Sequence, residues 1–202
     1  MSTMTLDDVA DGAVADVPRV HQWTRDEFYK MDEAGLFDGK RVELIEGQVI
    51  EMSAIYGPHA TAVTLADETL REIFGRGWVV RVQNPLSFET SDPQPDVAVI
   101  VGKARDFKDT HPATAALIIE VADSSLIYDR NYKSSLYAKA GIADYWIVNL
   151  QDEWLEVHRR PIANAKAQFG FSYADIRIFK AGDNVSPLAK PKAMIAVADL
   201  LP

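Results

Sequence analysis

The chain has 202 residues, of which 21 are lysine or arginine and 30 are aspartate or glutamate, for a formal net charge of −9. Hydrophobic residues make up 48% and charged residues 25%, which matches a globular domain and excludes an acidic disordered chain. The absence of cysteine excludes disulfides, cysteine zinc sites and thiol nucleophiles. No apolar run reaches the roughly 20 residues of a membrane span, and the N-terminus has no secretory signal pattern. We therefore expect a cytoplasmic protein without membrane contact.

The negative charge is concentrated in the N-terminal half. Residues 1–101 carry 18 acidic and 8 basic side chains, whereas residues 102–202 carry 12 and 13. Part of the excess lies in residues 1–20, which contain four aspartates but show no helical or strand periodicity. This pattern predicts a disordered acidic tail at residues 1–20 and a single domain over residues 21–202. The overall acidity also argues against a basic nucleic-acid-binding surface.

The first predicted element is a short helix, because Thr24 and Glu27 have the spacing of a capping box and Gly35 follows as a stop signal. Periodicity and turn residues then predict further elements in this order: a β-hairpin over 41–53 with its turn at 46–47, a helix over 58–74, strands at 78–83, 86–90 and 96–101, a buried central strand at 116–122, a helix over 129–140, paired strands at 144–150 and 154–160, and a strand at 171–179. This order favours one α/β domain built on a mixed sheet.

Three polar positions in this pattern have the residue types of a catalytic site. Asp96 opens an apolar strand, and Glu120 lies inside the apolar run LIIEVA, where a carboxylate is costly unless it is paired or metal-bound. Lys133 lies on the next predicted helix, midway between Asp129 and Tyr137 at intervals of four residues. Carboxylates from adjacent strands can converge on one Mg²⁺ ion. A lysine nearby can orient or deprotonate a water, or hold a phosphate.

Each of these positions also has a purely structural interpretation. Asp96 can be a turn residue, Glu120 can face solvent at a sheet edge, and the Asp129–Lys133 pair can be a surface ion pair. Judged from the residues alone, the catalytic and the structural interpretations are about equally supported. The combination of two acidic strands with a lysine on the following helix is what favours a metal site.

Six segments carry a more specific signal: WTRDEFYKMDEAGLF, RVELIEGQVIEMS, QPDVAVIV, LIIEVADSS, DRNYKSSLYAKAGIADYWIVNL and VADLL. In this order they resemble the Uma-type family of restriction-endonuclease-like proteins, over about residues 22–202. That family belongs to the PD-(D/E)xK nuclease superfamily. The resemblance implies a restriction-endonuclease-like core, in which helices flank a mixed β-sheet with extra β-hairpins and the metal site lies on adjacent central strands.

The resemblance also implies roles for individual residues. Asp96 matches the aspartate of the motif and Glu120 its second acidic position, so both would bind Mg²⁺ or Mn²⁺. The backbone carbonyl of Val121 would be a further ligand. Ala122 stands where the motif has its lysine, and the resemblance makes Lys133, on the following helix, the candidate replacement.

Two earlier residues are weaker candidates. Glu43 matches the glutamate of the family's "ELI" segment and could be a further acidic site residue, although an exposed hairpin carboxylate is an equal alternative. His59 begins a predicted helix on the same face as Val63, so we expect a packing or capping role rather than a catalytic one. The remaining histidines, glycines and serines form no zinc, phosphate-loop or serine-hydrolase motif.

These observations predict a Mg²⁺-dependent endonuclease that hydrolyses DNA phosphodiester bonds, with Asp96, Glu120, Lys133 and Glu43 as its catalytic set. Ala122 and the low basicity favour an alternative, an inactive nuclease-fold protein that acts as a DNA-binding or protein-interaction module. A hydrolase of other phosphate esters is a third interpretation. The resemblance implies a homodimer, for which we expect the strand pair 144–150 and 154–158 to be the contact surface. The acidity predicts weak, metal-dependent DNA binding.

Overall fold

The computed structural model describes residues 18–202. The acidic tail predicted for residues 1–20 therefore lies outside the described residues, except for residues 18–20, which are exposed and form no regular structure. Within residues 18–202 no helix is long and apolar enough to cross a bilayer.

The helices and strands follow one another in this order: α1 (Arg25–Glu33), β1 (Val42–Ile45), β2 (Gln48–Glu51), α2 (Gly57–Phe74), β3 (Trp78–Val82), β4 (Val97–Val101), the 3₁₀ helix η2 (Ala104–Phe107), β5 (Leu117–Ala122), α3 (Leu126–Tyr128), the π-helical turn η3 (Asp129–Lys133), α4 (Ser134–Lys139), β6 (Asp144–Asn149), β7 (Trp154–Ala163), β8 (Phe171–Lys180), β9 (Asn184–Val185), β10 (Ile195–Ala196) and the 3₁₀ helix η4 (Val197–Leu200).

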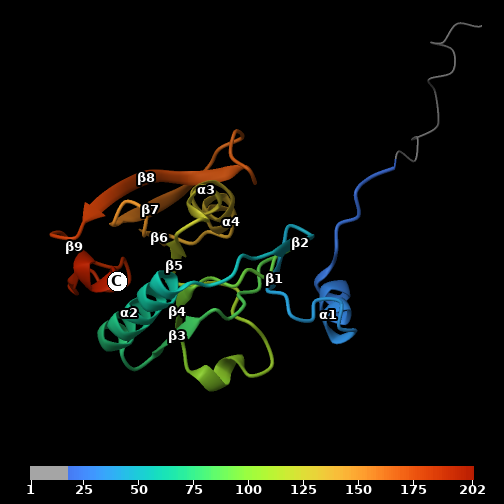
Figure 1. Ribbon diagram of the computed structural model, residues 1–202, viewed down its shortest axis with the longest axis horizontal. Coiled ribbons are helices and arrows are strands. Elements are labelled where there is room, and N and C mark those ends of the chain that lie inside the picture. Colours follow the sequence, from blue (N-terminus) through green and yellow to red (C-terminus); the bar gives the residue numbers. More distant parts are fainter. Residues whose placement is uncertain (1–17) are drawn as a thin grey trace, which may run out of the picture.

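Six strands form one mixed sheet in the order β3-β4-β5-β6-β7-β8. Strands β5 and β6 run parallel, and every other neighbouring pair in this sheet is antiparallel. Helix α2 covers one face of the sheet, and the continuous helical segment α3–η3–α4 covers the other (Figure 1). This arrangement confirms the predicted α/β architecture with a mixed sheet and flanking helices.

The core consists of one apolar layer on each face of the sheet. The layer under α2 takes Ile119 and Val121 from β5, whereas the layer under α4 takes Ile118 and Ala122. Successive side chains of a strand point to opposite faces, so Glu120 lies on the α4 face with its even-numbered neighbours. The prediction that this strand is central and buried is confirmed, because all of β5 is buried between β4 and β6.

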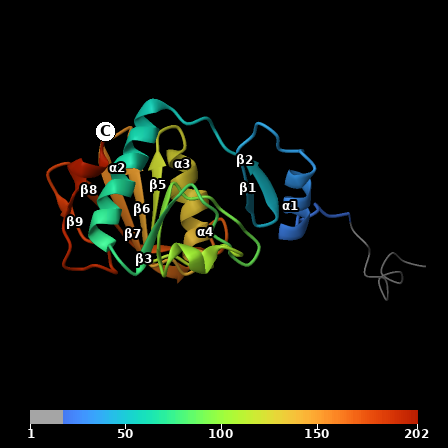
Figure 2. The same ribbon diagram turned by 90° about the horizontal axis from the view of Figure 1, so that it is seen from below.

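Helix α1 and the β1–β2 hairpin lie to one side of the six-stranded sheet (Figure 2). The capping box is present as predicted: Thr24 and Glu27 each accept a hydrogen bond from the other residue's backbone N–H. The hairpin is joined to the loop before β4 by a bridge between Leu44 and Asp92, and Arg25 forms an ion pair with Asp92 at 2.8 Å. These contacts hold β1 next to the start of β4.

Two predictions are wrong. Residues 86–90 form a loop rather than a strand, because β3 ends at Val82, Gln83 follows with a φ of +50°, and Asn84-Pro85 leads the chain away from the sheet. Leu86 nevertheless packs into the core. The predicted dimer surface at 144–150 and 154–158 lies inside the molecule, because β6 is fully buried and β7 is paired on both sides.

Candidate active site

The register of β4 and β5 brings the two predicted carboxylates together. Val97 pairs with Ile119, so continuing this antiparallel register by one residue places Asp96 opposite Glu120. The backbone N–H of Asp96 donates to Glu120 Oε2 at 3.0 Å, and the N–H of Val121 donates to Asp96 Oδ2 at 2.9 Å. Both carboxylates are thereby fixed by backbone groups of the opposite strand.

The side chain of Asp96 has two further partners. Gln83 Nε2 donates to its Oδ1 at 3.1 Å, and Nε2 of His59, from the first turn of α2, lies 3.1 Å from its Oδ2. Burial works against ionisation of Asp96, but the hydrogen bonds, above all the one with His59, outweigh burial and lower the pKa of this carboxyl. The same contact raises the pKa of His59 and favours its protonated form.

Lys133 joins two acidic residues that are far apart in the sequence. Its Nζ lies 2.7 Å from Glu43 Oε2 and 3.1 Å from Glu120 Oε1, and all three side chains are buried. The hydroxyl of Tyr137 also donates to Glu120 Oε1, at 2.6 Å. Lys133 thus connects β1, β5 and the helix over the sheet.

The helix that carries Lys133 is not regular. Residues Asp129–Lys133 form a π-helical turn between α3 and α4, so the helix begins at Leu126, earlier than predicted. Both ends of this turn, Asp129 and Lys133, are buried and line the same pocket. Such turns are rare and frequently occur at functional sites, where they redirect side chains.

The β1–β2 hairpin places Glu43 in the site. The burial pattern of β1 turns Glu43 inward, and one of its carboxylate oxygens accepts the backbone N–H of Gln94 at 3.0 Å. Gln94 Nε2 in turn donates to the Val42 carbonyl at 3.1 Å. The interpretation of Glu43 as an exposed hairpin carboxylate is therefore wrong, since its side chain is 2% exposed.

The cluster combines acidic and basic groups that are all buried. Four buried carboxylates surround one buried ammonium: they belong to Glu43, Asp96, Glu120 and Asp129, and the ammonium to Lys133. Burial raises the pKa of Glu120, and the neighbouring carboxylates add to this effect against the attraction of Lys133. Burial also works against the charge of Lys133, but Glu120 and Glu43 outweigh it and raise the pKa of Lys133 above its ordinary range. Lys133 is therefore charged at neutral pH.

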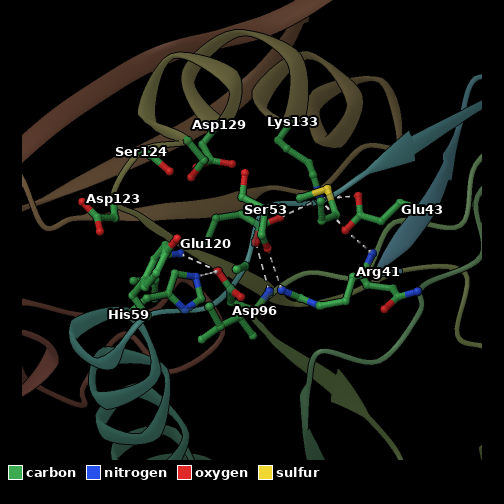
Figure 3. A pocket seen from close by; sticks show the side chains of 17 residues that line it. Arg41, Glu43, Ser53, His59, Asp96, Glu120, Asp123, Ser124, Asp129 and Lys133 are labelled. Carbon is green, nitrogen blue, oxygen red and sulfur yellow. Dashed lines mark hydrogen bonds and ion pairs between the residues drawn. The ribbon is translucent and has the colours of Figure 1, made fainter. Parts of the chain in front are cut away.

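All these side chains face one small pocket with a volume of about 80 Å³ that is partly open to solvent. Figure 3 shows Glu43, Asp96, Glu120, Asp129 and Lys133 directed into it from three sides, with His59 and Arg41 beside them. The five predicted site residues are thus brought together: Glu43, Asp96, Glu120, Val121 and Lys133 all line this pocket.

Several residues in or next to the site were missed by the sequence analysis. His59 contacts Asp96, whereas the sequence favoured a packing or capping role for it, and no side chain caps the N-terminus of α2. Asp129 precedes Lys133 by four residues, which was a usable signal. For Arg41 the only signal was its position next to the "VELI" segment, and Gln83 offered no signal at all.

The donor set fits a hard divalent cation. Mg²⁺ takes oxygen ligands and often uses only one or two protein carboxylates. Within residues 18–202 no group of three or more histidine, aspartate or glutamate side chains is arranged to hold a metal ion, so Asp96 and Glu120 could supply two side-chain ligands and no more. A cation here would favour the ionised form of Glu120, whose pKa is raised by burial.

The geometry therefore defines an α/β domain with a carboxylate–lysine site at the meeting point of two central strands. The family model Uma2, described as a putative restriction endonuclease, matches residues 25–198, and the chain belongs to this family. The chain is also similar to a solved structure of a putative nuclease of DUF820 from Anabaena variabilis ATCC 29413, with a TM-score of 0.66 and 15% identity over 88% of this chain and 96% of that one. At this identity the likeness shows a shared fold. No curated protein matches the chain.

Proposed function

We propose that the protein is a metal-dependent endonuclease that hydrolyses phosphodiester bonds in DNA. The observation that carries the proposal is the convergence of Asp96, Glu120 and Lys133 in one pocket of a chain that belongs to a nuclease-like family. Two carboxylates and a lysine are the groups that phosphodiester hydrolysis needs, since the reaction builds negative charge on phosphate oxygens.

Asp96 and Glu120, with the backbone carbonyl of Val121, would hold Mg²⁺ or Mn²⁺. The bound ion would supply Lewis-acid stabilisation of the phosphate oxygens and a lower pKa for a coordinated water. The chain's own contribution is to fix the two carboxylates through the Asp96 and Val121 N–H groups, so that they need no rearrangement when the ion binds.

Lys133 acts as a charged donor rather than as a base. Its ammonium forms ion pairs with Glu43 at 2.7 Å and Glu120 at 3.1 Å, which favour the protonated form that donates hydrogen bonds. Its role is to orient the attacking water and to stabilise negative charge at the phosphate. Glu43 is a positioning residue, because its carboxylate holds the Lys133 ammonium at 2.7 Å.

Arg41 supplies a second cation for a phosphate in this acidic pocket. Lys133 is occupied by two carboxylates, whereas in residues 18–202 Arg41 forms no ion pair and its Nη1 reaches only the Ser53 carbonyl, at 3.4 Å. Figure 3 shows the Arg41 side chain extending into the pocket. A guanidinium in this position matches a phosphate next to the scissile one.

A cleavage assay tests the proposal. Supercoiled, linear duplex and single-stranded DNA are incubated with the protein and Mg²⁺ or Mn²⁺, with EDTA as the metal-free control. We expect metal-dependent product that is lost in Asp96→Asn and Glu120→Gln and retained in Glu68→Gln, a matched change at an exposed glutamate of α2. Undiminished product in the two site variants would refute the assignment.

Isothermal titration calorimetry separates this function from the alternatives. Cation binding without cleavage of any DNA substrate would favour the inactive DNA-binding or protein-interaction module instead. Cleavage of a small phosphodiester such as bis(p-nitrophenyl) phosphate, without cleavage of DNA, would favour a hydrolase of other phosphate esters. The position of Lys133, whose Nζ lies 3.1 Å from Glu120 Oε1 and can take the place of the motif lysine missing at Ala122, is what favours the active enzyme.

A further inference from the structure

The outer edge of strand β8 is free. Strand β8 is the last of the six strands, and no strand within residues 18–202 pairs with its outer side (Figure 1). Edge strands are usually protected by prolines, inward-pointing charges or bulges, because their free N–H and C=O groups can pair with another chain. The middle of β8 contains no proline, and two of its apolar side chains are exposed: Ile176 is 55% exposed and Ile178 is 53% exposed.

The alternation of backbone hydrogen bonds along β8 identifies which N–H and C=O groups point away from β7. The N–H of Lys180 donates to Asp183 Oδ2 and not to β7. Backbone groups along an antiparallel strand alternate between its two sides, so Ile176 and Ile178 direct their N–H and C=O groups outward. These are also the two exposed isoleucines, so the same residues offer unpaired backbone and apolar surface.

The residues around Ile176 are complementary in charge to the same residues of a second, antiparallel copy of β8. Asp175 and Arg177 flank Ile176 on the opposite face of the strand and form an ion pair at 3.0 Å within the chain. In an antiparallel pair of β8 strands centred on Ile176, Ile176 lies opposite its own copy. Asp175 then lies opposite Arg177 of the partner subunit, and Arg177 opposite the partner's Asp175. Each pair of Asp175 with Arg177 of the partner subunit is a non-hydrogen-bonded pair, the kind in which facing side chains lie closest.

We propose that two copies of the chain associate through β8, related by a two-fold axis at Ile176, and join their sheets into one. A two-fold axis requires each contact to occur twice, so both opposite-charge pairs form together. The pairing satisfies the outward backbone groups of Ile176 and Ile178 and covers both isoleucines. This surface replaces the buried strands β6 and β7 as the dimer contact, and it does not depend on the proposed nuclease activity.

Charge reversal tests both the surface and the register. The molecular mass of the full chain is measured by analytical ultracentrifugation over a range of concentrations. We expect a dimer for the wild type and, since like charges then face each other twice, a dimer about tenfold weaker or more for Asp175→Arg and for Arg177→Asp. Asp109→Arg, a matched reversal on an exposed loop, leaves the dimer unchanged.

Combining the two charge reversals, in one chain or in a mixture of two chains, makes the test decisive. The double variant Asp175→Arg/Arg177→Asp restores the facing charges, so it dimerises like the wild type. An equimolar mixture of the two single variants also forms dimers, because a strand with two arginines then faces a strand with two aspartates. Circular dichroism and urea unfolding verify that each variant is folded, and these charges are at the surface, so we expect little loss of stability.

The remaining outcomes overturn the proposal. A wild-type protein that stays monomeric at all concentrations shows that β8 does not pair. A dimer that neither single reversal weakens places the contact elsewhere. Single variants that are monomeric but do not associate when mixed, or a double variant that stays monomeric, exclude the register centred on Ile176.

Discussion

Replacing Lys133 with methionine is the most informative perturbation of the buried cluster. Methionine preserves most of the side-chain volume but removes the ammonium that lies 2.7 Å from Glu43 and 3.1 Å from Glu120. Since Lys133 is 1% exposed, water cannot take its place, and two buried carboxylates lose their counter-charge. In metal-free buffer we therefore expect a large loss of stability.

The magnitude follows from the burial of the pair. Removing one partner of a buried ion pair costs about 3–5 kcal/mol, because the remaining charge stays desolvated. In a domain of this length each kcal/mol lowers the melting temperature by about 2–4 °C, so Lys133→Met should melt about 6–20 °C lower than the wild type. Lys139→Met, at a partly exposed lysine paired with Glu46 two turns away, should cost about 1 kcal/mol or less.

A double-mutant cycle with Glu43→Gln isolates the ion pair itself. When Glu43 is already neutral, Lys133→Met leaves one uncompensated carboxylate, that of Glu120, instead of two. The lysine substitution should then cost about 1–3 kcal/mol less than in the wild type. Urea unfolding followed by tryptophan fluorescence, to which the buried Trp146 contributes, measures all four proteins. Additivity of the two substitutions within about 0.5 kcal/mol would falsify the inference that Lys133 and Glu43 stabilise each other.

Three further predictions concern other parts of the molecule. Burial opposes ionisation of Glu156, but its contact with His158, at 3.7 Å, and the hydrogen bonds from Arg130 lower its pKa below the ordinary value of 4.5. The stability it contributes is therefore present above pH 4.5 and lost as the pH falls below that value, and acid titration of unfolding should be less steep in Glu156→Gln than in the wild type. Mg²⁺ at a hundred times its dissociation constant should stabilise the wild type by about 2.7 kcal/mol, and a thermal shift that persists in Asp96→Asn would place the ion elsewhere. Arg41→Ala should raise KM for DNA by about tenfold or more with little change in kcat, since it removes one charge-assisted contact to a phosphate, and an unchanged KM would contradict that role.

Local sequence signals were sufficient for most elements. Residues close together in the sequence determine the capping box at Thr24 and Glu27, the hairpin turn at 46–47 and the end of the helix before Gly75. Such short-range patterns act in the same way in any fold. Residues 86–90 are the exception, because their strand-like composition was overridden by the backbone conformation at Gln83.

The two carboxylates could also be expected from the sequence. Asp96 and Glu120 lie on apolar strands that follow each other in the chain, and consecutive strands commonly lie side by side. Antiparallel pairing then needs only the right register to bring them together. The structure supplies that register, with Val97 opposite Ile119.

The contacts that complete the site could not be predicted from the sequence. Glu43 and Lys133 are 90 residues apart, and the π-helical turn that directs Asp129 and Lys133 into one pocket has no sequence signature of its own. His59 looked like a residue packed under its helix because its neighbours on that face are apolar. Only the position of α2 against the start of β4 shows that it reaches Asp96.

The net charge of the chain illustrates the same difference between what the sequence and what the tertiary structure determine. The sequence by itself determined that the chain is acidic, with a net charge of −9, that it is rich enough in apolar residues to form a core, and where most strands and helices lie. Only the tertiary structure decided that four of the carboxylates are buried around one lysine, and that β8 lies at an edge of the sheet whereas the strands expected to form the dimer contact lie inside it. The physical reason is that composition and periodicity depend on neighbouring residues. The burial of a charge and the order of strands depend on which distant segments pack together.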